Sequence, residues 1–72
     1  MTAFNTDRAP SPKVTHDNAV EIWLRLWRGD FKHRIAQHFE INVARIYDVR
    51  RGKLHPGSEA AAREIWNKQN AA

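Results

Sequence analysis

The 72-residue sequence contains no cysteine, no long hydrophobic run and only three glycines and three prolines. Without cysteine the chain cannot form disulfides or thiolate metal sites. Such a composition fits a reducing compartment such as the cytoplasm. No apolar stretch approaches the roughly 20 residues that a membrane-spanning helix requires. The first thirteen residues also lack the apolar segment of a secretory signal, so we expect a cytoplasmic protein.

The charge of the chain is concentrated in its middle. The formal net charge is +4, and positions 25–53 hold eight basic and three acidic residues, whereas the remainder holds four basic and five acidic ones. A local cationic excess attracts polyanions such as nucleic acids, although many small domains are mildly basic without binding any. At this length we expect one small domain, near the lower limit for a core without cross-links.

Apolar periodicity predicts an all-α protein with helices at about 17–28, 31–39, 43–51 and 59–69. Residues 1–14 contain two prolines and no periodicity, so we expect a disordered N-terminal arm followed by one domain over 15–72. Asn18 and Glu21 have the spacing of a capping box at the start of the first helix. The expected caps of the later helices are Asp30, Asn42 and Ser58, and the expected stops are Gly29 and Gly52.

Two short helices around position 41 are expected to cross closely. Ile35, Ala36 and Phe39 form one apolar stripe, and Ile46 and Val49 form a second. Ile41 fills the corner between them, and the small side chain of Ala36 permits a close approach of the second helix. This is the layout of a helix-turn-helix, in which the second helix is presented to a nucleic-acid groove.

The first helix has two apolar edges. The stripe expected to face the core consists of Val20, Trp23, Leu24 and Trp27, and core packing explains the tryptophans better than base stacking does. A second edge consists of Ala19, Ile22 and Leu26. Either Ile65 and Trp66 of the fourth helix cover this second edge, or a second copy of the chain does. We favour a homodimer, because small helix-turn-helix proteins commonly read two half-sites.

The outer side of the third helix is the predicted reading surface. Small and aliphatic side chains can contact a thymine methyl, Arg51 can pair with guanine, and Asp48 can accept from cytosine or fix a neighbouring arginine. The expected base-reading residues are Asn42, Val43, Ala44, Tyr47, Asp48 and Arg51. The expected phosphate contacts are Arg28, Lys32, Arg34, Arg45, Arg50 and Lys53. The amides at the start of the second helix are a further candidate, which a cap at Asp30 would weaken.

The segment from about Trp27 to Lys53 resembles the helix-turn-helix DNA-binding superfamily of bacterial and phage regulators. The matching residues are Ile35, Ala36, Phe39, Ile41, Ile46 and Val49, followed by the basic end over 50–53. The resemblance implies a small transcriptional regulator that binds double-stranded DNA in the cytoplasm, at the nucleoid. Glu40 departs from the family, which most often has glycine there, so we expect an opened or lengthened turn.

Enzymatic and metal-dependent functions find little support in the sequence. His33 and His38 are five residues apart on one helix and point in different directions, while His16 and His55 lie far apart in the chain. No serine has a histidine and an acid around it, and no glycine-rich phosphate loop is present, so we expect neither catalysis nor a cofactor. The alternatives are RNA binding and a protein-interaction adaptor that uses the first helix and Trp66.

Overall fold

The computed structural model describes residues 14–70, which form four α-helices and no strand within that range. The helices are α1 (His16–Trp27), α2 (Lys32–Phe39), α3 (Val43–Arg51) and α4 (Ser58–Asn70). The predicted all-α fold is therefore confirmed, with each helix boundary within one residue of the prediction. The predicted arm falls outside the described residues except for Val14, which packs against the core.

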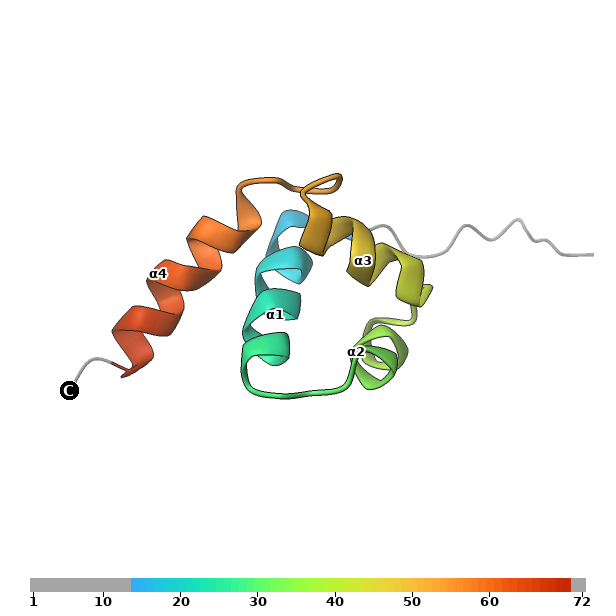
Figure 1. Ribbon diagram of the computed structural model, residues 1–72, viewed down its shortest axis with the longest axis horizontal. Coiled ribbons are helices and arrows are strands. Elements are labelled where there is room, and N and C mark those ends of the chain that lie inside the picture. The colour runs from blue at the N-terminus through green and yellow to red at the C-terminus, as the bar shows by residue number, and fades with distance from the viewer. Residues whose placement is uncertain (1–13, 71–72) are drawn as a thin grey trace, which may run out of the picture.

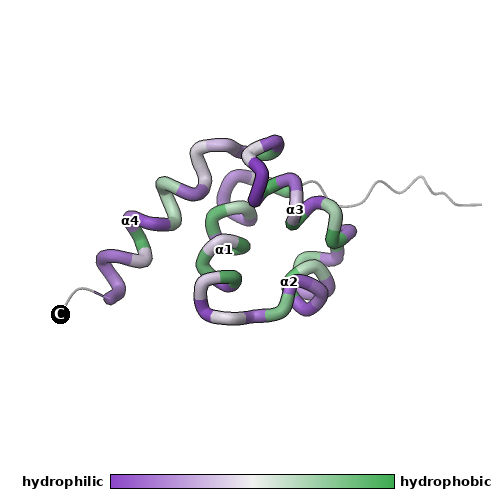
Figure 2. Tube along the Cα trace, viewed as in Figure 1, coloured by the Kyte–Doolittle hydropathy of each residue, from purple (hydrophilic) through white to green (hydrophobic). Residues whose placement is uncertain are grey.

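Helix α1 lies at the centre of the fold, between α4 on one side and the α2–α3 corner on the other (Figure 1). Hydrophobic residues recur along α1 and the corner, whereas α4 alternates between hydrophilic and hydrophobic positions (Figure 2). The buried core contains residues from all four helices: Ala19, Val20, Ile22, Trp23, Ile35, Ala36, Ile46, Val49 and Ala62. No helix within residues 14–70 combines the length and the apolar character needed to cross a membrane.

The start of α1 differs from the prediction. Thr15 is the N-cap, and its hydroxyl accepts from the Asn18 amide at 3.0 Å while the Asn18 side chain accepts from the Thr15 amide at 3.3 Å. Asn18 is therefore the second partner of the capping box and does not cap the helix itself. Glu21 takes no part in the cap, because its carboxylate binds the Arg25 guanidinium at 2.6 Å.

The three helices α1, α2 and α3 end in the same backbone arrangement. The amide of Asp30 donates to the Arg25 carbonyl at 3.0 Å, Ile41 donates to Ala36 at 2.9 Å, and Lys53 donates to Asp48 at 2.9 Å. Each ending needs one residue in the left-handed conformation, and these residues are Gly29, Glu40 and Gly52, with φ values of 96°, 57° and 81°.

The prediction that the turn at Glu40 is opened or lengthened is wrong. Glu40 adopts the left-handed conformation that glycine favours, and only three residues separate α2 from α3. The Ile41 amide bonds back to Ala36, and the Ile41 side chain packs against the core beyond the turn. These two anchors hold the corner closed despite the steric cost of a side chain at a positive φ.

Both apolar edges of α1 contribute to the core of the single chain. Trp23 Nε1 donates to the Ser58 hydroxyl at 3.1 Å, and the Trp27 ring meets the Trp66 ring edge-on at 5.8 Å. The stripe expected to face the core therefore contacts α4, at Trp23 and Trp27. Ala19 and Ile22, expected to await the fourth helix or a second copy, are fully buried within one chain.

Ser58 is part of α4 and contributes to its attachment. Its side chain is buried and accepts from Trp23, while its amide donates to the His55 carbonyl at 2.9 Å. Ser58 was expected to cap this helix, but it is instead the first residue of the helix, and its hydroxyl accepts from Trp23. Farther along α4, Ala62 is fully buried, whereas Ile65 stays exposed. Of the two residues expected to fold back from α4, Trp66 contacts α1 and Ile65 remains at the surface.

Candidate nucleic-acid interface

Helix α3 is fixed by its inner side and by its cap. Ile46 and Val49 are 0% and 1% exposed, so this side of the helix is wholly inside the molecule. Asn42 caps the helix as predicted, and its side-chain oxygen accepts from the Ala44 amide at 2.8 Å. Gly52 ends the helix, also as predicted. The position and rotation of α3 are therefore set, which determines which side chains it turns outward.

The six predicted base-reading residues divide into two groups. Asn42, Tyr47 and Arg51 are exposed, and Tyr47 retains 40% of its surface. Val43, Ala44 and Asp48 are only half-buried, and Val43 packs against the core. The predicted reading surface is therefore exposed at Asn42, Tyr47 and Arg51 and only partly exposed at its other three positions.

Asp48 already has a cationic partner. Its carboxylate lies 3.1 Å from the Arg45 guanidinium one turn earlier, and the Asp48 side chain is only 18% exposed. This geometry matches one of the two roles predicted for Asp48, that of fixing a neighbouring arginine. It also directs part of the hydrogen-bonding capacity of Arg45, a predicted phosphate contact, toward α3 itself.

A contact between α2 and α3 orients the aromatic side chain of the candidate surface. The Lys32 ammonium lies 5.7 Å from the centroid of the Tyr47 ring. A cation at this distance from an aromatic ring is attracted by the negative face of the ring. Lys32 and Tyr47 were predicted separately as phosphate-binding and base-reading residues, and the fold brings them together. Their spacing along the chain carries no signal of this contact.

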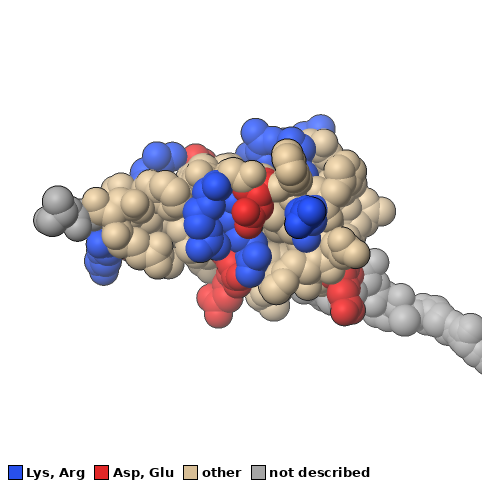
Figure 3. Space-filling view, turned by 90° about the horizontal axis from the view of Figure 1, so that it is seen from below, with Lys and Arg blue, Asp and Glu red and all other residues tan. Residues whose placement is uncertain are grey.

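The predicted phosphate contacts lie mostly at the surface. Lys32 is half-buried, and the remaining five are exposed: Arg28, Arg34, Arg45, Arg50 and Lys53. They come from the end of α1, from α2 and from both ends of α3. On the face shown in Figure 3, basic side chains form separate groups with acidic ones between them. This face does not carry one continuous cationic field.

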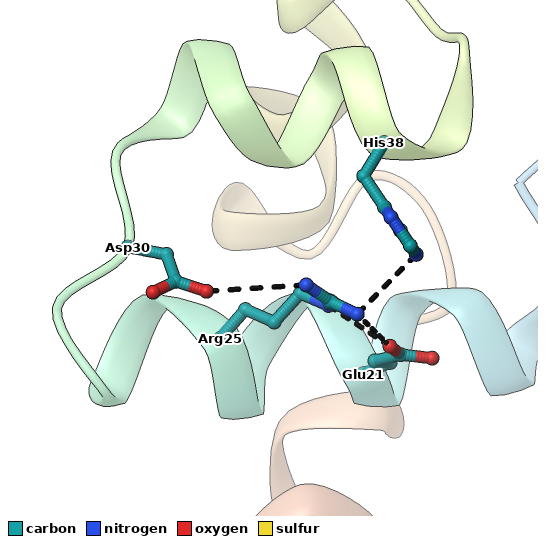
Figure 4. A network of polar contacts seen from close by, with 4 residues as sticks. All are labelled: Glu21, Arg25, Asp30 and His38. Atoms are coloured by element: carbon teal, nitrogen blue, oxygen red, sulfur yellow. Dashed lines mark hydrogen bonds and ion pairs between the residues drawn. The ribbon is translucent and has the colours of Figure 1, made fainter.

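The start of α2 has no side-chain cap. Phe31 occupies the N-cap position and makes no capping hydrogen bond, so the prediction that Asp30 caps this helix is wrong. The Asp30 carboxylate instead lies 4.0 Å from the Arg25 guanidinium (Figure 4). The first amides of α2 are consequently free of a competing carboxylate cap, which removes the objection raised against an anion contact at this point.

Arg25 connects α1 to α2, a role that its place in the sequence did not indicate. Figure 4 shows its guanidinium between Glu21 on the same helix and His38 on α2, with the His38 Nε2 atom at 3.3 Å. The guanidinium also lies 5.7 Å from the centroid of the Phe39 ring. Arg25 therefore helps to set the position of α2, and through it that of α3.

The histidines do not assemble a metal centre in the described part of the chain. His16 and His55, distant in sequence, meet edge-on with ring centroids 5.8 Å apart, and His55 Nε2 donates to the Val14 carbonyl at 2.6 Å. This contact joins the start of α1 to the connection between α3 and α4. Within residues 14–70, no three side chains of His, Asp or Glu are grouped so as to hold an ion.

Comparisons of the chain with protein families, with curated proteins and with solved structures found no match.

Proposed function

We propose that this protein binds double-stranded DNA, with α3 lying in the major groove. Helix α3 buries Ile46 and Val49 completely and turns Tyr47 and Arg51 outward. This asymmetry is the main support for the proposal. An α-helix with its side chains is about 10–12 Å in diameter, which suits a major groove roughly 12 Å wide.

The roles of the outward residues follow from their chemistry. Arg51 presents a planar guanidinium that can pair with the O6 and N7 acceptors of guanine. The Tyr47 hydroxyl can donate to a phosphate, while its ring is held beside Lys32. Asn42 lies at the tip of α3, where its amide is partly occupied by the cap. We therefore assign sequence reading chiefly to Arg51 and to the edge of Ala44, and assign Tyr47 a positioning contact with a phosphate.

Basic residues on both sides of α3 support the second part of the proposal, contact with the phosphate backbone. Arg34 on α2 and Arg50 and Lys53 at the end of α3 are exposed. Each phosphate contact releases counterions, so binding of this kind weakens as salt rises. Replacing Arg34 by glutamine should lower affinity for every duplex and reduce the salt slope by about one unit. We infer a cytoplasmic regulator of bacterial or phage type that requires no cofactor.

A binding titration tests the proposal. Sites are first selected from a random duplex library with the full chain, and affinity is then measured by fluorescence anisotropy at two salt concentrations. Changing Tyr47 and Arg51 together to alanine should abolish the preference for the selected site and leave the helical circular dichroism unchanged, because both side chains are exposed. Each lost base contact is worth about 1–3 kcal/mol of discrimination.

Helix α4 supplies a matched control. Ile65→Ala combined with Lys68→Ala removes one exposed apolar and one exposed basic side chain far from α3 in the chain, and should leave selectivity intact. A single-stranded RNA competitor, included at equal nucleotide concentration, should displace the duplex poorly. Absence of duplex binding at low salt would refute the proposal. If the variant with alanine at positions 47 and 51 keeps full selectivity, the residues that read the DNA sequence lie elsewhere on the protein.

A further inference from the structure

Phe31 is the most exposed large hydrophobic residue in the described part of the chain, with 72% of its surface in solvent. It occupies the N-cap of α2, a position where serine, threonine, aspartate or asparagine would satisfy a free amide. Phenylalanine there forgoes the cap and buries little of its ring. Neither the start of the helix nor the core therefore explains why an aromatic side chain is present at this point.

A shallow depression of about 330 Å³ adjoins Phe31. Its walls come from the end of α1, the connection from α1 to α2, the first residue of α2 and one residue of α3. The apolar part is formed by Trp23, Leu26, Trp27 and Phe31, and the charged part by Asp30, Lys32 and Arg50. The volume is near the lower end of ligand-binding clefts, which suits one large side chain better than a whole small molecule.

The charged rim of the depression is predominantly basic. Lys32 and Arg50 form no ion pair with any carboxylate of residues 14–70, whereas the Asp30 carboxylate lies 4.0 Å from Arg25. Figure 3 views the molecule from the side of the α1–α2 connection and shows basic side chains on both sides of an acidic group. Two cations without acidic partners among residues 14–70, beside an exposed aromatic surface, favour a ligand that is both anionic and apolar.

We propose that this depression docks an acidic segment of another protein. A large apolar side chain of that segment contacts Phe31 and Trp27, and flanking carboxylates pair with Lys32 and Arg50. Exposed apolar surface with a polar rim is typical of protein-interaction sites, in which one buried anchor supplies most of the affinity. A DNA duplex would satisfy the two cations through its phosphates but would leave the apolar wall uncovered, so an acidic peptide fits the site better.

This docking site shares Trp23, Leu26 and Trp27 with the adaptor surface predicted from the sequence, but it adds Phe31 and excludes Trp66. That surface was the apolar face of α1 with Trp66, and α4 covers it: Val20 and Trp23 are buried, and Trp66 contacts Trp27. Phe31 lies beyond the end of α1, where α4 supplies none of the lining residues. A partner could therefore bind here without displacing α4.

The test is a titration of the full chain with blocked hexapeptides in the absence of DNA. The probe has two leucines between pairs of aspartates. One control peptide carries serines in place of the leucines, and a second carries lysines in place of the aspartates. Isothermal calorimetry should show saturable binding of the probe that weakens with salt, and ¹⁵N-labelled protein should show amide shifts over residues 29–32 and at Arg50. Neither control peptide should bind.

Variants of the chain locate the site. Phe31→Ser should weaken the probe at least about tenfold, as expected for loss of an anchor side chain, and Arg50→Gln should weaken it less. Ile65→Ser and Lys68→Gln, which alter an exposed aliphatic and an exposed basic residue of α4, should bind like the parent chain. Circular dichroism of Phe31→Ser should match that of the parent chain, because the ring is mostly in solvent.

Three results would overturn the proposal. The first is absence of saturable binding of the acidic probe to the parent chain. The second is equal affinity of the Phe31→Ser variant for the probe. The third is that the parent chain does not bind the peptide and that Phe31→Ser binds the duplex more weakly than the parent chain does. This result would show that the face contacts DNA. Because the titration contains no nucleic acid, failure of the DNA proposal would leave its outcome unaffected.

Discussion

The α2–α3 corner and the α1–α4 contact are held together by different kinds of interaction. At the corner, three residues join the helices, and backbone hydrogen bonds, the Asn42 cap and the buried Ile46 fix the geometry. Helix α4 starts 31 residues after the end of α1, at Ser58 after Trp27, and attaches to it through side chains. Local backbone rules therefore position the candidate reading helix, whereas side-chain contacts position the supporting one.

The α1–α4 contact depends on tryptophans at successive turns. Trp23 donates to Ser58, Trp27 meets Trp66 edge-on, and the Arg63 guanidinium lies 5.3 Å from the Trp27 ring centroid. Aromatic rings bury large areas, and a small domain has few other sources of core. The corner instead uses aliphatic residues and the small Ala36, which lets two backbones approach closely.

The corner should be the more sensitive region to loss of core volume. Ile46→Ala removes a fully buried side chain that anchors α3, and should cost about 2–5 kcal/mol of unfolding free energy. A domain of this size has few kcal/mol in total, so the variant should be largely unfolded at 25 °C. Urea titration followed by circular dichroism measures the change. A loss below about 1 kcal/mol would show that α3 is not held mainly through its inner side.

The α1–α4 contact should respond to removal of its buried hydrogen bond. Ser58→Ala leaves the Trp23 indole N–H without its partner in a buried position and should cost about 1–2 kcal/mol. Trp23→Phe removes the donor and also reduces the buried area. In a double-mutant cycle the two changes should couple by about 1 kcal/mol. Additive effects would indicate that the hydrogen bond contributes nothing beyond packing.

The smallest effect concerns the shared backbone arrangement at the helix ends. Glu40→Gly relieves a side chain at φ 57° and should raise the unfolding free energy by about 0.5–1 kcal/mol. Gly52→Ala introduces the same strain at φ 81° and should lower it by about 1 kcal/mol. A Cβ at position 52 meets no atom within 4 Å, so that cost comes from the backbone alone. In thermal melts, Glu40→Gly should raise the melting temperature and Gly52→Ala should lower it. Shifts in the same direction would contradict the assignment of backbone strain to these two positions.

The sequence was sufficient for features that depend on neighbouring residues. The helix at 43–51, its Asn42 cap and its Gly52 stop follow from local periodicity and capping chemistry, and the structure has all three. The failures at Asn18, Asp30 and Glu40 share one cause. In each case a polar side chain was assigned by its local preference, while pairing with Thr15 or Arg25, or backbone closure of the corner, determined the outcome.

Features that depend on residues far apart in the chain could not be read from the sequence. The two edges of α1 are both apolar, so periodicity alone does not tell which one faces α4; the partnerships of Trp23 and Trp27 decide it. The same limit applies to the candidate interface. Lys32 and Tyr47 were each predicted at the surface, but their contact, and the half-buried state of Asp48, arise from how α2 and α3 cross.

The placement of the aromatic chromophores gives the two regions separate optical signatures. All three tryptophans lie along the α1–α4 contact, and the only tyrosine lies on the outer side of α3. Tryptophan fluorescence, excited at wavelengths that tyrosine does not absorb, therefore reports whether α4 remains packed against α1. The efficiency of energy transfer from Tyr47 to the tryptophans reports the distance between α3 and the α1–α4 contact. A single unlabelled sample can thus distinguish local release of one helix from unfolding of the whole chain.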